Sequence, residues 1–340
     1  MYQSFYGLKE APFELTANPK YLFFTGQHRE ALSNLEYGLS SAKPITLLIG
    51  DAGTGKTTLI RAALESDRCR GVRCIYLNNP LLSAKDFVRL LAGRFELTPA
   101  AAESKVVLLE ELERRLRDER ARGRIFALVV DEAQSLTSEL LEEIRLLANI
   151  ETETQKLLPL VLAGQPELAE RLEDPSLRQL KQRVTLRCEL KPFELADTAA
   201  YIARRVSQAG GSPAQLFTRR AVTLVHEHAQ GIARLINVIC DNALVTGMAL
   251  GRQPVDGTII SEVCRDLALR APQTAESAPL NGTTNSQDMN RPRELAGEAP
   301  TVEEPIIDEP VNREAVAPRR SFRTWLRRRM DSNPISVVSE

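Results

Sequence analysis

The stretch Ile45-Thr-Leu-Leu-Ile-Gly-Asp-Ala-Gly-Thr-Gly-Lys-Thr57 decides the fold of this chain. Its first part, Ile45–Ile49, is an apolar run of strand length, and a segment with helical periodicity follows the glycines. Gly50, Gly53 and Gly55 allow backbone conformations and close approaches that a Cβ atom would obstruct. Successive N–H groups in such a turn point inward as an anion-binding nest, and the N-terminus of the next helix adds a positive dipole. The sequence therefore predicts a phosphate-binding loop between a strand and a helix.

The loop matches the pattern G-x-x-x-x-G-K-[ST], in which each fixed residue has a chemical task. Lys56 would reach the β- and γ-phosphates of a nucleotide, and the Thr57 hydroxyl would bind Mg²⁺. A chance glycine turn would show the same spacing, but the strand before it and the helix after it favour a phosphate loop. The expected nucleotide-binding residues of the loop are Gly50, Asp51, Ala52, Gly53, Thr54, Gly55, Lys56, Thr57 and Thr58.

A second motif, Ile125-Phe-Ala-Leu-Val-Val-Asp131-Glu132, is an apolar strand that ends in two carboxylates. Carboxylates at the C-terminal end of a parallel strand lie at the ligand-binding edge of the sheet. We expect Asp131 to hold Mg²⁺ together with Thr57, and Glu132 to orient and polarise the attacking water. The alternative is that the acidic pair caps the helix expected over residues 139–149.

The alternation of strands and helices predicts an α/β fold, a doubly wound parallel sheet with helices on both faces. Five runs have strand length: 45–49, 74–77, 125–130, 157–163 and 184–190. Helical periodicity lies between them at 57–65, 84–95, 105–122, 139–149 and 177–183. Four further helical segments follow without strands, at 197–208, 219–228, 232–250 and 258–269, and Thr218 is a candidate N-cap for the second of them.

This pattern divides the chain into four parts: an α/β domain over 1–195, a small all-helical lid over 196–270, an acidic, proline-rich linker over 271–318 and a basic tail over 319–340. The linker composition predicts disorder, because it offers too little apolar area to offset the entropy of ordering. The tail places Phe322, Trp325 and Leu326 among arginines, as in a short amphipathic helix that docks on a partner or an anionic membrane. A disordered, solubilising tail is the alternative.

Bulk properties set broad limits on function. The formal net charge is −1, so nucleic-acid or membrane binding would need a local patch. The five cysteines include no Cys-x-x-Cys, which indicates neither a zinc site nor a disulfide framework. No run approaches the ~20 apolar residues that span a bilayer, and the N-terminus does not resemble a signal peptide.

The two motifs, the strand count and the helical lid resemble an AAA+ module. The stretches Leu160-Val-Leu-Ala-Gly-Gln-Pro-Glu-Leu168, Leu180-Lys-Gln-Arg-Val184 and Gly231-Ile-Ala-Arg-Leu-Ile-Asn237 look like the secretion-pathway protein A family of ATPases. The opening Tyr6-Gly-Leu and Gln27-His-Arg-Glu-Ala-Leu32 are similar to it as well. The resemblance covers about residues 1–270 and implies ATP and Mg²⁺ as cofactors.

The family resemblance also implies roles for residues outside the two motifs. Gln165 matches the position that senses the γ-phosphate, and the alternative is a turn residue before Pro166. Arg183 is the better candidate for an arginine finger supplied in trans, Arg178 is the alternative, and either could be a surface arginine. Arg234 matches the lid residue that contacts the γ-phosphate, unless it is a plain surface charge.

Three further features of the sequence have competing interpretations. Leu8, Pro12 and Phe13 resemble the part that packs near adenine but could equally be core. The arginine-rich stretch 114–124 is more typical of a helix end than of an anion-binding patch, and Gly123 suits the position after that end. His226 and His228 are two residues apart, which places them on different helix faces and argues against a metal site.

We therefore expect an ATP hydrolase that drives or licenses assembly of an envelope secretion, pilus or exopolysaccharide export system. Expected partners are further copies of the chain and a protein of the envelope machinery, with the tail as a contact to an anionic membrane. The expected location is the cytoplasm, with peripheral attachment at the inner membrane as an option. Two alternatives are a DNA-handling ATPase like transposition helpers, although DNA is not the expected partner, and a nucleotide-dependent scaffold with little turnover.

Overall fold

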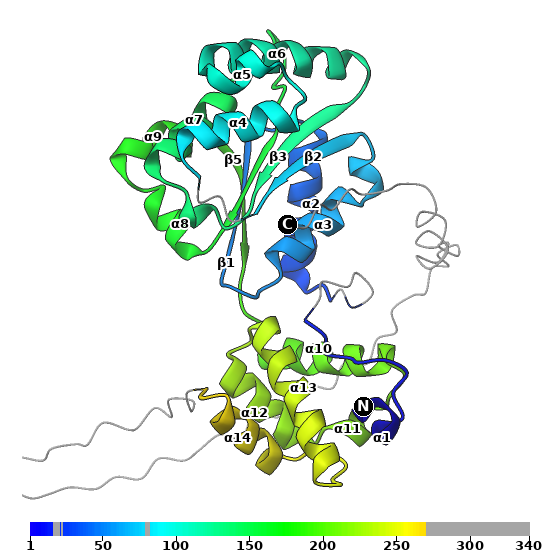
Figure 1. The fold of residues 1–340 in the computed structure, drawn as a ribbon. Helices are drawn as coiled ribbons and strands as arrows, with labels where there is room; N and C mark the ends of the chain where they lie inside the picture. The colour runs from blue at the N-terminus through cyan, green and yellow to red at the C-terminus, as the bar shows by residue number, and fades with distance from the viewer. Residues whose placement is uncertain (16–20, 22, 79–81, 270–340) are drawn as a thin grey trace, which may run out of the picture. The chain divides into compact units, whose positions relative to one another are not determined.

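The computed structural model describes residues 1–15, 21, 23–78 and 82–269 (Figure 1). The predictions for the linker (271–318) and the basic tail (319–340) lie outside these residues. The strands are β1 Ile45–Gly50, β2 Val72–Leu77, β3 Ile125–Val130, β4 Leu160–Gly164 and β5 Val184–Leu190. The helices are α1 Tyr2–Tyr6, α2 Gly26–Ser40, α3 Lys56–Leu64, α4 Ala84–Arg94, α5 Pro99–Glu103, α6 Lys105–Ala121, α7 Ser138–Leu147, α8 Pro166–Arg171, α9 Arg178–Lys181, α10 Leu195–Gln208, α11 Pro213–Leu216, α12 Arg219–Ala229, α13 Ala233–Ala249 and α14 Gly257–Asp266.

The five strands form one parallel sheet in the order β2-β3-β4-β1-β5. The predicted doubly wound, five-stranded sheet is therefore confirmed. Strand β1 lies between β4 and β5, so the loop that leaves its C-terminal end emerges within the sheet rather than at its border. Ligands of open parallel sheets bind at this C-terminal edge.

Side chains of the sheet alternate between two hydrophobic layers, because successive residues of a strand point to opposite faces. Leu47 and Ile49 of β1 belong to the layer covered by α4 to α9, whereas Leu48 belongs to the layer covered by α2 and α3. Both faces of the central strands are buried, which explains their almost continuously apolar sequences.

Helix α2 is the main element that was not predicted from the sequence. Thr25 caps it by accepting a hydrogen bond from the His28 backbone N–H. Ala31, Leu35 and Leu39, four residues apart, pack it onto the sheet. Helix α2 therefore covers the same face of the sheet as α3. It also brings His28 to the phosphate loop.

Helices α10 to α14, called the lid below, pack around a second hydrophobic core. Thr218 caps α12, as predicted, by accepting a hydrogen bond from Ala221 N–H at 3.1 Å. The start of the chain joins this core: Leu8 and Phe13 are buried in it, and the Phe13 ring meets Phe217 edge-on with centroids 5.9 Å apart.

The arginine-rich stretch forms the end of α6 and the turn after it. Glu119 is 1% exposed and pairs with Arg115, Arg122 and Arg124. Gly123 follows the helix at a φ of 73°, the left-handed conformation expected after a helix end. These arginines tie the helix end to a buried carboxylate, which favours the structural interpretation over an anion-binding patch.

Candidate functional site

The glycine-rich loop connects the C-terminal end of β1 to the first turn of α3. Gly53 and Gly55 have φ angles of 86° and 102°, conformations that residues with a Cβ rarely adopt. A Cβ at Gly50 would lie 2.8 Å from the Leu190 carbonyl oxygen and 2.9 Å from Thr54 Oγ1. Thr54 Oγ1 in turn donates to the Asp51 carbonyl at 2.9 Å, which closes the turn on itself.

Lys56, the first residue of α3, is only 5% exposed. Its Nζ donates to the carbonyl oxygens of Gly50 at 2.7 Å and of Asp51 at 3.0 Å. Burial lowers the pKa of this ammonium group, and the nearby Glu132 and Asp131 carboxylates act in the opposite direction. The charge therefore lies within the turn, opposite the carboxylates that follow β3.

Thr57 and Asp131 are in direct contact, as expected for two residues that would hold the same Mg²⁺ ion. Thr57 Oγ1 donates to Asp131 Oδ2 at 2.6 Å, and the Tyr76 hydroxyl donates to the same oxygen at 2.6 Å. Hydroxyl and carboxylate oxygens are the hard ligands that Mg²⁺ prefers, so the donor set fits this ion. Burial and the hydrogen bond to Asp131 raise the pKa of Tyr76, which keeps the phenol a donor.

Glu132 is positioned by two glutamine side chains and a strained backbone. Its φ of 54° lies in the left-handed region, where a residue with a Cβ is uncommon. Gln134 Nε2 donates to Glu132 Oε2 at 2.6 Å, and Gln165 Nε2 reaches the same oxygen at 3.3 Å. Gln165 also directly precedes Pro166 and α8, so its side chain contacts Glu132 while its backbone leads into the helix.

Arg171 of α8 braces this segment from behind. Its Nη1 donates to the carbonyl oxygens of Gln134 and Leu136, each at 2.7 Å. Neither Arg171 nor Gln134 belongs to a motif that could be recognised in the sequence. Their role depends on contacts between β4, α8 and the turn after β3, and no local spacing indicates such contacts.

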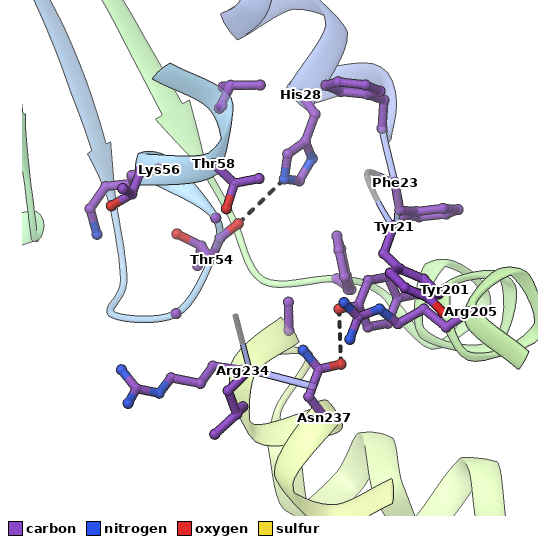
Figure 2. A pocket seen from close by; sticks show the side chains of 18 of the residues that line it. Tyr21, Phe23, His28, Thr54, Lys56, Thr58, Tyr201, Arg205, Arg234 and Asn237 are labelled. Carbon is purple, nitrogen blue, oxygen red and sulfur yellow. Dashed lines mark hydrogen bonds between the residues drawn. The ribbon is translucent and has the colours of Figure 1, made fainter. Parts of the chain in front are cut away.

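A cavity of about 390 Å³ opens in front of the loop, between the sheet edge and the lid (Figure 2). Loop residues from Gly53 to Thr58 line one side, and Glu132 also lines the cavity. Aromatic residues line the other side, among them Phe23, Phe193 and Tyr201. Anion-binding backbone at one end and aromatic rings at the other are the features that a nucleotide requires.

His28 lies between the two sides and contacts the phosphate loop. Its Nε2 is 3.4 Å from the Thr54 carbonyl oxygen and its Nδ1 is 2.8 Å from Thr25 Oγ1. Burial lowers the pKa of this imidazole. A neutral ring with its proton on Nε2 satisfies both contacts, since a carbonyl can only accept and the threonine hydroxyl can donate to Nδ1.

The lid contacts the phosphate loop through the start of α13. Arg234 N–H donates to the Gly53 carbonyl at 3.2 Å, and its side chain lines the cavity. Figure 2 shows Arg234 beneath the loop, extending away from the aromatic side of the cavity. Lid and loop residues thus border one cavity.

Arg183 and Arg178 are not part of this cavity. Arg183 directly precedes β5, where Val184 pairs with Ile45 at the start of β1, whereas the phosphate loop follows the other end of β1. Arg183 therefore lies at the edge of the sheet opposite the phosphate loop. The Nε atom of Arg183 is buried without a hydrogen-bond partner.

Two other sequence features lie outside the site. Leu8, Pro12 and Phe13 do not line the cavity; among the described residues near the N-terminus, Glu14, Leu15, Tyr21, Phe23 and Phe24 do. His226 Nδ1 lies 2.9 Å from Thr198 Oγ1. Within residues 1–15, 21, 23–78 and 82–269, no group of three or more metal-ligating side chains comes together.

Comparisons with known proteins bear on these observations. Residues 39–172 match the family model described as AAA domain. Over 256 residues the chain is 41% identical to general secretion pathway protein A of Aeromonas hydrophila, an alignment that covers 75% of this chain and 46% of that protein. The chain belongs to the AAA+ ATPases of the secretion-pathway protein A family. It spans about half the length of this relative.

Solved structures agree with this ATPase in fold. The ORC2 protein of Aeropyrum pernix, in ADPNP–ADP complexes, is 16% identical with a TM-score of 0.56, covering 76% of this chain and 72% of that one. Cdc6p of Pyrobaculum aerophilum is 19% identical with a TM-score of 0.57, covering 74% and 70%. Identities this low establish the fold alone. In the part of the ATPase that the structure describes, no helix is both long and apolar enough to cross a bilayer.

Proposed function

We propose that this ATPase binds ATP with Mg²⁺ in the cavity and hydrolyses it to drive or license assembly of an envelope export machine. The observation that carries the proposal is the convergence of Lys56, Thr57 and Asp131 on one turn in front of Glu132. The phosphates would lie on the main chain of Gly53 to Thr58, at the N-terminus of α3.

Each residue has a stated task in this mechanism. The Lys56 ammonium would leave the carbonyls of Gly50 and Asp51 for the phosphates, which are stronger acceptors. Thr57 and Asp131 would hold Mg²⁺, which neutralises charge on the phosphate oxygens. Glu132 would polarise the attacking water, and Gln165, held against it, would contact the water or the γ-phosphate.

The lid and a second subunit would complete the site. Arg234 is joined to the loop by its backbone, so γ-phosphate binding would be transmitted to the lid through α13. Arg183 of a neighbouring copy would neutralise charge in the transition state. Homo-oligomers are therefore part of the proposal.

The export role rests on the relationship to general secretion pathway protein A, which covers three-quarters of this chain. We propose a cytoplasmic ATPase that works at the inner membrane with a protein of the envelope machinery. In the native host, a strain carrying Glu132→Gln should fail to deliver an exported protein or polymer to the cell surface while still making it. Duplex DNA that stimulates hydrolysis with a steep salt dependence would contradict this role.

The hydrolytic part has its own test. Glu132→Gln should abolish turnover while ATP still binds, because the carboxylate polarises water but holds neither phosphate nor metal. The matched control is Glu139→Gln, an exposed position in the first turn of α7. Retention of wild-type turnover by Glu132→Gln would refute the assignment.

A further inference from the structure

A buried arginine of the lid lines the aromatic side of the cavity. Arg205, in α10, is 6% exposed, and its Nε and Nη1 atoms are buried without a hydrogen-bond partner. Neither the sequence motifs nor the family model, which ends at residue 172, assigns it a role. A buried guanidinium is costly unless its N–H groups are satisfied, so this residue calls for an explanation.

Two tyrosine rings hold the guanidinium in place. The Arg205 Cζ atom lies 4.8 Å from the ring centroid of Tyr21 and 5.3 Å from that of Tyr201. The rings are fixed in turn, because the Tyr201 hydroxyl donates to Asn237 Oδ1 at 2.9 Å and the Tyr21 hydroxyl donates to Glu10 Oε1 at 2.7 Å. Arg205 is therefore pre-positioned on rigid supports.

Packing of the lid explains the stacking but not the unsatisfied nitrogens. Among the residues that the structure describes, no carboxylate forms an ion pair with Arg205, although Glu119 of this chain shows how such a pair is built. An apolar side chain of similar length would fill the space between the rings without leaving buried donors unpaired. Arg205 lines the cavity, so an acceptor atom of a bound ligand is the partner that would satisfy these donors.

The position of Arg205 indicates which part of the ligand this is. Figure 2 shows Arg205 with Tyr21 and Tyr201 on one side of the cavity, and Lys56 and Thr54 on the other. If phosphates occupy the loop, the opposite end of a nucleotide, its base, extends toward the aromatic side. Nucleobases offer ring-nitrogen and carbonyl acceptors along their edges, and a guanidinium offers only donors.

We propose that Arg205 donates hydrogen bonds to acceptor atoms of the nucleobase and thereby makes nucleotide affinity depend on the base. This inference rests on the proposed nucleotide site and deepens it by naming the residue that reads the base. Arg205 thus contributes to affinity at the expense of the stability of the empty protein, because its donors are satisfied only when the nucleotide is bound.

The test compares ATP with ribose 5-triphosphate, which lacks the base, by titration calorimetry on the full chain. In Arg205→Met the Kd for ATP should rise about tenfold or more, while the Kd for ribose 5-triphosphate stays at the wild-type value. Without nucleotide the variant should melt at or above the wild-type temperature. The control is Arg204→Met, the exposed neighbour in the same helix, which should match the wild type throughout.

Two results would overturn the inference. Unchanged ATP affinity in Arg205→Met would show that the guanidinium is structural, and an equal loss for both ligands would place it at the phosphates or the ribose. If Arg205→Met does not fold, Arg205→Lys is used instead, since it keeps the charge but loses Nε–H and the planar group that packs on the tyrosine rings. This variant should also bind ATP more weakly while its affinity for ribose 5-triphosphate stays unchanged. Wild-type protein that binds neither ligand would refute the proposed function itself.

Discussion

Gly53→Ala probes the contact between the phosphate loop and the lid. The residue has a φ of 86°, and an added Cβ would lie 2.7 Å from Arg234 Cβ and 3.1 Å from Ile232 Cγ2. The left-handed backbone costs an alanine about 1–2 kcal/mol. Displacement of the lid would also break the Arg234 N–H to Gly53 C=O hydrogen bond, about 1 kcal/mol more. The expected total is about 2–3 kcal/mol.

The measurement is thermal unfolding of the nucleotide-free protein. At about 2–4 °C per kcal/mol, Gly53→Ala should lower the melting temperature by roughly 4–12 °C. The matched control is Gly251→Ala, also at positive φ (63°) but with nothing within 4 Å of its Cβ, so it should show only the backbone part. Equal melting temperatures for the two variants would refute the contact between loop and lid.

Two further predictions concern residues away from the cavity. Arg183→Ala should lower kcat roughly 10³-fold while ATP still binds. Mixing this variant with a separately purified Lys56→Ala protein should restore part of the turnover, because some interfaces then pair an intact phosphate loop with an intact Arg183. If Arg178→Ala causes the loss instead, Arg178 is the arginine finger. Glu119 has its pKa lowered from 4.5 to about 2, first by the hydrogen bond from Arg124. A carboxyl group whose pKa is lowered on folding stabilises the fold above about pH 4.5. The melting temperature of the wild type should therefore exceed that of Glu119→Gln at pH 7, and this difference should shrink as the pH falls from 4.5 toward 2. A difference that stays constant with pH would contradict this assignment.

The sheet and the phosphate loop could be predicted because their signals are local. The apolar run of β1, the glycines and Lys56 are contiguous, and Asp131 with Glu132 ends a second apolar run. The sheet order then brings Thr57 to Asp131, which are 74 residues apart in sequence. An almost continuously apolar strand is typical of a parallel sheet covered on both faces. Polar residues directly after such a strand therefore lie at the ligand-binding edge of the sheet.

The aromatic side of the cavity could not be predicted because its signals are tertiary. Arg205 follows Tyr201 by four residues on α10, a spacing that by itself suggests an ordinary helix surface. Only the folded chain brings the ring of Tyr21 to the guanidinium as well. Helix α2, by contrast, carried a usable signal, since Thr25 precedes apolar residues at positions 31, 35 and 39.

The most direct measurement of the central claim is the affinity of the full chain for ATP in the presence of Mg²⁺, before and after Lys56→Ala. Loss of a buried, charge-assisted hydrogen bond to phosphate costs about 1.5–3 kcal/mol, so the Kd should rise roughly 10- to 100-fold. Lys85→Ala, at an exposed position of α4, is the control and should bind as the wild type does. Wild-type affinity in Lys56→Ala would contradict the claim that this loop holds the phosphates.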